Sequence, residues 1–253
     1  MACGLAGAIL AGSFSVPAQA GTVQIEPQKD NTLFESATGD SLSNGAGVYL
    51  FTGLTALDEL RRGLVAFDVA GSVPPGATIT DVSLTLYMSK TIAGPTPVSL
   101  HRVLADWGEG SADAPGEEGT GTAAAGGDVT WVHTFSPFQF WLTPGGDFDP
   151  VPSATTSVGG VGPYTWSAAP QMLADVQAWH ADPSSNFGWV LIGAETTLPS
   201  AKRFDTREGA NPAVLTVKFE EAAAVPALSG WGAAAAALGL LAAAAIRRRR
   251  TAP

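Results

Sequence analysis

The clearest pattern along the chain is an alternation of apolar and polar side chains. In the segment 82–88 every second residue is apolar, and Ser83, Thr85 and Tyr87 lie between. A period of two is typical of a β-strand with one buried face. The segment 189–194 (WVLIGA) is instead continuously apolar, which favours a strand that is buried on both faces.

Shorter apolar runs recur along the chain, and turn residues separate them at intervals of roughly ten positions. They predict further strands at 22–27, 32–36, 48–51, 61–70, 98–104, 155–161 and 213–219. Many short strands joined by frequent turns indicate an all-β fold, and we predict a β-sandwich with jelly-roll-like topology.

One segment, 168–182, has helical periodicity. Pro170 lies near its start, and Met172, Val176 and Trp179 recur on one face. We therefore expect a single short helix in the domain, with that face packed against the sheets.

The segment 108–128 differs from its surroundings in composition. It is rich in glycine and alanine and contains the acidic pair Glu117 and Glu118. Such a sequence has little apolar surface to bury, so it predicts an exposed loop.

The two ends of the chain carry targeting signals. Residues 1–20 are apolar and end in Ala18-Gln19-Ala20, the small-x-small pattern of a signal-peptidase site. The single cysteine, Cys3, would leave with this segment, which excludes cysteine chemistry from the mature protein. We expect the protein to be exported.

At the other end, a short motif precedes an apolar run and a basic cluster. A helix over 225–246 would measure about 33 Å, enough for a hydrocarbon core of roughly 30 Å. The basic cluster should stay on the cytoplasmic side. The motif comprises Val225, Pro226, Ala227, Leu228, Ser229, Gly230, Trp231 and Gly232, and the cluster comprises Arg247, Arg248, Arg249 and Arg250.

This C-terminal segment resembles the sorting signals of the IPTL-CTERM and PEP-CTERM kind. The resemblance implies transient anchoring in the inner membrane, with an exosortase-like sorting enzyme as partner, and a final location at the cell surface or outside the cell. An ordinary stop-transfer helix is the alternative, because any single-span protein needs the same apolar and basic parts.

The chain therefore divides into a signal peptide (1–20), one β-sandwich domain (21–220), a linker (221–224) and a C-terminal sorting segment (225–250). Without the four tail arginines, nine basic residues remain against 23 acidic ones, a net charge of about −14. This balance excludes nucleic acid as a partner. It is compatible with neutral glycans or divalent cations.

A second resemblance covers nearly all of the domain. The strings KDNTLFES, RRGLVAFDV, PPGATITDVSLTLYM, SNFGWVLIG and FDTREGANPAVLTV follow one another in the order found in the DNRLRE domain family, which is related to the repeats of archaeal disaggregatases. This implies an exported β-sandwich similar to carbohydrate-binding modules. The family supplies no agreed ligand and no catalytic residues.

Five charged residues lie at predicted strand ends, where guanidinium and carboxylate groups can pair and join two sheets. They are Arg62, Asp68, Asp205, Arg207 and Glu208. We favour this structural role over ligand binding, because a partly buried pair specifies the fold.

Enzymatic motifs are weak. The string GDSLSNG at 39–45 resembles the nucleophile block of GDSL-type esterases, with Ser41 as nucleophile, but the partner motifs of that family are missing. His101, His133 and His180 lack metal-ligand spacing, which disfavours zinc. We predict no catalytic residues, although a polysaccharide-active enzyme remains a third possibility.

Oxygen ligands for calcium are more plentiful. The candidates are Asp30, Asp40 and Asn44, with Glu35 nearby, and the pair Asp147 and Asp149. Neither group has a recognised calcium-loop spacing, so solvated loop acids are the alternative.

Tryptophans are the candidates for sugar binding, because flat rings stack on sugar C–H groups. Trp179 and Trp189 fit core patterns and should be buried. The glycan-binding candidates flank loops and are Trp107, Trp131, Trp141 and Trp166. Packing under long loops is the alternative for each of them.

The sequence thus predicts an exported surface or matrix protein with a non-catalytic module that binds extracellular polysaccharide. The alternative is a structural or adhesive surface protein without a sugar site, with loops that calcium stabilises.

Overall fold

The computed structural model describes residues 19–37, 39–167 and 169–221, and one compact unit covers Ala20–Glu221. Most of the signal segment predicted at 1–20 and the whole sorting segment predicted at 225–250 lie outside the described residues. Within the described ranges, no helix is long and apolar enough to cross a membrane.

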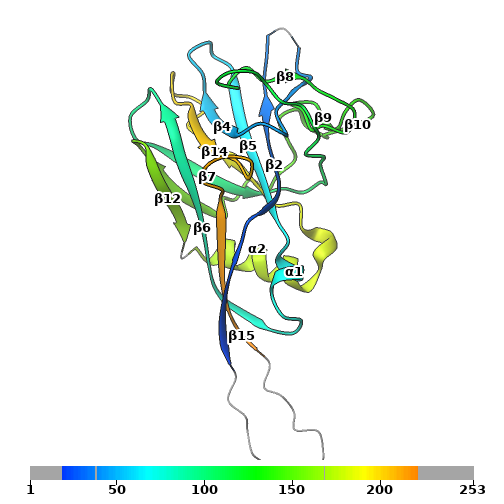
Figure 1. The fold of residues 1–253 in the computed structure, drawn as a ribbon, viewed down its shortest axis with the longest axis vertical. Helices are drawn as coiled ribbons and strands as arrows, with labels where there is room; N and C mark the ends of the chain where they lie inside the picture. The colour runs from blue at the N-terminus through cyan, green and yellow to red at the C-terminus, as the bar shows by residue number, and fades with distance from the viewer. Residues whose placement is uncertain (1–18, 38, 168, 222–253) are drawn as a thin grey trace, which may run out of the picture. The chain divides into compact units, whose positions relative to one another are not determined.

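The unit is mainly β (Figure 1). Its strands are β1 (Ala20–Ile25), β2 (Pro27–Phe34), β3 (Leu42–Ser43), β4 (Tyr49–Leu54), β5 (Leu60–Phe67), β6 (Thr78–Thr91), β7 (Thr96–Arg102), β8 (Thr122–Ala123), β9 (His133–Phe135), β10 (Gln139–Phe140), β11 (Ala154–Val158), β12 (Gly162–Ser167), β13 (Trp189–Ile192), β14 (Lys202–Asp205) and β15 (Val214–Glu220). The helices are α1 (Val69–Ser72), α2 (Pro170–Ala181) and the 3-10 turn η1 (Pro183–Ser185).

Eleven strands form one antiparallel sheet that curls on itself. Its order is β1-β15-β6-β14-β4-β5-β13-β7-β11, with β12 paired to β6 and β2 paired to β5. The half that contains β6 and β15 and the half that contains β5, β13 and β7 contribute side chains to one apolar cluster. The fold is therefore sandwich-like, as the strand pattern predicted.

Strand β4 joins the two halves. Its residues Tyr49 to Thr52 pair with β14, whereas Gly53 and Leu54 pair with β5. Gly53 has φ +99°, and a Cβ at this position would lie 2.9 Å from the carbonyl oxygen of Ser200. Only glycine satisfies both conditions at this corner.

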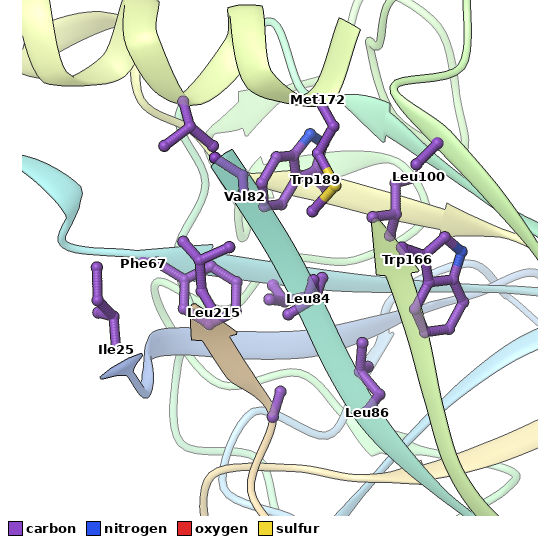
Figure 2. Close-up of a cluster of buried hydrophobic side chains, with 14 of the residues drawn as sticks. Ile25, Phe67, Val82, Leu84, Leu86, Leu100, Trp166, Met172, Trp189 and Leu215 are labelled. Atoms are coloured by element: carbon purple, nitrogen blue, oxygen red, sulfur yellow. The ribbon is translucent and has the colours of Figure 1, made fainter. Parts of the chain in front are cut away.

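The inner core confirms the strand predicted at 82–88. Val82, Leu84 and Leu86 of β6 are at most 3% exposed, and they face Phe67 and Trp189 from the opposite half (Figure 2). Their alternation places polar residues on the outer face of β6, where β-strands of this kind contact solvent.

Helix α2 covers one end of this core. Met172, Val176 and Trp179 are fully buried in the same cluster, and Met172 lies near Trp189 in Figure 2. The helix predicted at 168–182 is thereby confirmed, including the face that packs.

A second core lies on the outer face of β5 and β13. Leu64, Ala66 and Val190 alternate with the inner-core residues of the same strands and join a separate cluster. The segment 103–148 covers them, contributing Trp107, Val103, Val129, Trp131 and Trp141. This confirms the prediction that β13 is buried on both faces.

The prediction of an exposed loop at 108–128 is wrong for several of its residues. Ala112 and Ala114 are 6% and 3% exposed, and Asp128 is fully buried. The segment has little regular structure, but it packs on the sheet through alanines and buried carboxylates.

Further elements differ from the predictions. The short strands β3, β8, β9 and β10 lie outside every range predicted as a strand. Strands β12 and β14 were not predicted, because both carry polar or charged residues between isolated apolar ones. The strand predicted at 61–70 ends at Phe67, where the Asp68 side chain accepts a hydrogen bond from the Gly71 N–H and begins α1.

We expect Gly53→Ala to lower the free energy of unfolding more than Gly76→Ala. Both glycines have positive φ, which costs an alanine on the order of 1–3 kcal/mol. Only Gly53 also lacks space, because nothing lies within 4 Å of a Cβ at Gly76, so its variant should lose roughly a further 1–3 kcal/mol. Urea unfolding of the two variants measures the difference, and equal losses would contradict the role of the close approach at β4.

Candidate functional site

The four loop-flanking tryptophans are buried. Trp107 is 1% exposed, Trp131 6%, Trp141 5% and Trp166 0%. The indole N–H of Trp107 donates to the carbonyl oxygen of Phe187, and that of Trp141 donates to Thr130. Rings buried to this extent cannot stack on a sugar, so the prediction that these four tryptophans bind glycan is wrong. Trp107, Trp131 and Trp141 pack under the segment 103–148, and Trp166 packs in the inner core.

Exposed apolar side chains instead gather on the β9–β10 hairpin and the residues after it. Phe138 is 87% exposed, Phe140 62% and Leu142 94%. The Phe140 ring lies 4.6 Å, centroid to centroid, from the His133 ring. A cluster of large exposed apolar groups is typical of a binding surface.

Phe140 and Leu142 line an open groove of about 620 Å³, referred to below as the hairpin groove. Its remaining lining residues are Arg62, Leu104, Ala105, Thr143, Pro144, Gly146, Asp147 and Phe148. The hairpin groove therefore combines apolar side chains with a hydroxyl and a carboxylate, and its volume lies in the usual range of ligand sites.

Arg62 lines the hairpin groove and is fixed by contacts with its neighbours. Its guanidinium donates two hydrogen bonds to Glu195, at 2.7 and 3.0 Å, and one to the Gly145 carbonyl at 2.8 Å. The same group lies 5.0 Å from the Trp131 ring centroid and 5.3 Å from that of Phe148. Buried Trp131 thus contacts a residue that lines the groove, but it does not line the groove itself.

Asp147 lines the hairpin groove and stabilises the turn at Leu142 and Thr143. Its two carboxylate oxygens accept hydrogen bonds from the backbone N–H groups of Leu142 and Thr143, at 2.8 and 2.9 Å. This turn aims Leu142 outward and leaves lone pairs on a partly exposed carboxylate.

The predicted ion-pair residues separate into different contacts. Arg62 pairs with Glu195, not with Asp68, which caps α1. Asp205 accepts a hydrogen bond from the Asn211 amide at 2.8 Å. The five residues therefore do not form a single ion-pair network that joins the two halves of the sheet. Among them, only Arg207 and Glu208 form an ion pair with each other, with 2.8 Å between Nε and Oε1.

Arg207 lies in a cluster of three carboxylates, referred to below as the acidic cluster. One oxygen from each of Asp30, Glu109 and Glu208 lies within 4.8 Å of the others. Arg207 donates two hydrogen bonds to Glu109, both at 2.8 Å, and its backbone N–H donates to Asp30 at 2.9 Å.

Burial raises the pKa of Asp30 to about 7, and the neighbouring Glu208 and Glu109 carboxylates add to the rise. The hydrogen bond from the Arg207 N–H and the charge of Arg207 act in the opposite direction. Burial also raises the pKa of Glu208.

Of the calcium candidates, only Asp30 belongs to a group of ligand-type side chains within the described ranges. Asp40 accepts from the Ser36 N–H, and Asp149 accepts from the Val151 N–H. Asn44 and Asp147 are likewise engaged within the chain. Asp40, Asp147 and Asp149 stabilise local turns, whereas Asn44 donates to Glu118, which is distant in the chain. Neither of the two groups that the sequence suggested, Asp30 with Asp40 and Asn44 or Asp147 with Asp149, is found as a cluster of acids in the described part of the chain.

Sequence reasoning missed a buried polar network that holds the segment 108–128. Glu118, 6% exposed, accepts hydrogen bonds from the Asn44 amide and the Tyr49 N–H. Asp128 accepts from the N–H groups of Ser111 and Ala125. Nothing in the composition separates these acids from solvated ones, because only the fold shows which backbone N–H groups lie near them.

The residues considered for catalysis lie on separate elements. Ser41 is exposed just before β3, whereas His101 lies on β7, His133 on β9 and His180 on α2. The Nδ1 atom of His133 lies 2.9 Å from the hydroxyl oxygen of Thr130. The Nδ1 atom of His101 hydrogen-bonds the backbone oxygen of Asp149. The geometry gives no support to the esterase hypothesis.

A scan against models of known protein families found no match, and a search among curated proteins found none either. The hairpin groove and the acidic cluster are therefore the observations from which a function can be inferred.

We expect the free energy of unfolding to fall as pH rises from about 4 to about 7 in the presence of a chelator. Unfolding returns the pKa of Asp30 to its ordinary value of about 3.8, so in this window the unfolded chain releases a proton that the folded chain keeps. Asp30→Asn should remove this contribution, on the order of a few kcal/mol, and flatten the pH dependence measured by urea unfolding. The exposed Asp113→Asn is the matched control, and an unchanged slope in Asp30→Asn would contradict the assignment.

Proposed function

We propose that this protein is a non-catalytic glycan-binding module that acts at the bacterial cell surface or in the extracellular matrix, with the hairpin groove as its sugar site. The observation that carries the proposal is the exposed ring of Phe140 beside a carboxylate and a hydroxyl in one open groove. A jelly-roll-like sandwich of the DNRLRE kind, similar to carbohydrate-binding modules, is the finer fold assignment that belongs to this proposal.

The chemistry of the hairpin groove suits a sugar. Phe140 and Leu142 offer apolar surface to the C–H faces of a pyranose ring. Asp147 and Thr143 offer oxygens to its hydroxyls, and a few well-placed polar groups of this kind fix the orientation of a ligand. The ligand is a surface polysaccharide, because an open groove can bind an internal stretch of a sugar chain as well as its terminal residue.

A neutral glycan is favoured over an anionic one. The cation of the hairpin groove, Arg62, is already paired with Glu195 at 2.7 Å. The domain as a whole is acidic, so its field repels polyanions.

Binding is favoured over catalysis because of the acids available. Among the described residues that line the hairpin groove, Asp147 is the single carboxylate, and backbone N–H groups bond both its oxygens. Glycoside hydrolysis by the usual route requires two carboxylates on either side of the scissile bond.

The location in the envelope rests on the two ends of the chain. The apolar segment 1–20 supports export, and the motif, apolar run and arginine cluster at 225–250 support transient anchoring and handling by an exosortase-like enzyme. Both assignments are part of the proposal.

We expect Phe140→Ala to weaken polysaccharide binding about tenfold, because the ring is 62% exposed and lines the hairpin groove. The melting temperature should fall by only a few degrees, which corresponds to loss of the ring contact with His133. Phe138→Ala is the matched control: it removes an equally large ring from the same hairpin, but Phe138 does not line the groove. Isothermal titration against a panel of neutral exopolysaccharides provides the affinities.

Equal affinities for Phe140→Ala and the parent protein would remove the hairpin groove from the proposal. No saturable binding of the parent protein to any glycan would favour the alternative, a structural or adhesive surface protein without a sugar site.

We expect a chain that ends at Ala224 to be released into the medium, and the full chain to be recovered first with the membrane fraction. The difference follows from the apolar run and the four arginines that the shorter chain lacks. Cell fractionation with an antibody to the domain measures it, and equal distribution of both chains would contradict the anchoring role of 225–250.

A further inference from the structure

The acidic cluster connects three segments that are far apart along the chain. Asp30 belongs to β2, Glu109 lies in the segment after β7, and Glu208 lies in the turn between β14 and β15. One carboxylate oxygen of each lies within 4.8 Å of the other two. Carboxylates at this separation repel one another strongly unless a positive charge lies between them.

Arg207 compensates only part of this charge. Its guanidinium bonds Glu109 through two nitrogens and Glu208 through Nε, all at 2.8 Å. One guanidinium against three carboxylates leaves two negative charges when all three are ionised. The nearest lysine along the chain, Lys29, is already bonded to Asp106 at 2.8 Å.

Asp30 is the group with an unmet requirement. Its side chain is 1% exposed, and its Oδ2 accepts the Arg207 N–H at 2.9 Å. Its Oδ1 is buried and has no hydrogen-bond partner among the described residues. A buried carboxylate oxygen without a partner costs more than an ordinary lost hydrogen bond, so a ligand at this atom would stabilise the fold.

We infer that Asp30, Glu109 and Glu208 bind one divalent cation, and that the cation is calcium. The donor set consists only of carboxylate oxygens, which hard cations prefer and which zinc and copper sites rarely use alone. Calcium accepts irregular geometry and six to eight oxygens, whereas magnesium requires a near-ideal octahedron. A doubly charged ion also matches the two uncompensated charges.

Solvent has access to the cation site from one side. Glu109 lines an open pocket of about 450 Å³ that also contains Lys29, Asp106 and Asn186, and 28% of the Glu208 side chain is exposed. Water can therefore complete the coordination shell. Both oxygens of Glu109 bond Arg207, but Oε2 accepts a single hydrogen bond and keeps a lone pair for the cation.

Calcium at this position would join β2, the segment that covers the outer core and the β14–β15 turn. Because the unfolded chain does not hold these carboxylates together, the cation binds the folded state selectively and raises its stability. The site is separate from the hairpin groove and involves none of its lining residues.

The test is calorimetric titration of the purified, chelator-treated protein with calcium chloride, and with magnesium chloride for comparison. We expect saturable calcium binding with a stoichiometry of about one, weaker magnesium binding, and a melting temperature several degrees higher at roughly 100 times the calcium Kd. Absence of calcium binding and of any shift in melting temperature would overturn the inference.

Two variants and one control locate the site. Asp30→Asn should abolish calcium binding, and Glu208→Gln should weaken it at least about tenfold while keeping the fold, since Glu208 is partly exposed. Asp113→Asn, an exposed acid in the same loop segment as Glu109, should bind as the parent does. If Asp30→Asn does not fold, Glu208→Gln decides: an affinity equal to that of the parent overturns the assignment. Glycan binding is titrated separately with Phe140→Ala, so failure of one proposal is distinguishable from failure of the other.

Discussion

The double burial of the β5–β13 half of the sheet is the constraint on which the remaining structure depends. One face of these strands packs against β6 and β15, and the other face presents Leu64, Ala66 and Val190. An apolar face of this kind must be covered, because exposing it would cost roughly 25 cal/mol per Å². The covering material is the segment 103–148, which has few residues in regular strands. The site and most of the unusual polar contacts follow from this arrangement.

An irregular segment over a core has backbone groups that need partners, since an unpaired buried N–H or C=O destabilises the fold. Buried carboxylates supply many of them. Glu118 accepts from Val48 and Tyr49, and Asp128 accepts from Ser111 and Ala125. Acidic side chains of the segment therefore hold it on the sheet by accepting hydrogen bonds from backbone N–H groups.

The same segment creates the two regions with binding chemistry. Its tryptophans are buried in the outer core. The aromatic rings of the segment that are exposed are therefore phenylalanines of the β9–β10 hairpin, beside the hairpin groove. Its beginning carries Glu109 to Arg207 and Asp30, which forms the acidic cluster. A groove with exposed rings and a cluster of carboxylates thus arise from one structural requirement, the covering of a second apolar face.

The sequence by itself determined the elements whose patterns are local. Alternation at 82–88, the continuous apolar run at 189–194 and the helical period from Met172 to Trp179 each follow from which faces are buried. The structure has all three elements, although the strand in the apolar run ends at Ile192. It did not determine strands β12 and β14, whose residues lack such a period. Tertiary structure alone decided which tryptophans are buried and that Arg62 pairs with Glu195 and not with Asp68. It also brought Asp30 close to Glu109 and Glu208, which lie 79 and about 180 positions further along the chain. The physical reason is that burial and pairing depend on how distant segments pack, whereas periodicity depends only on neighbours along the chain.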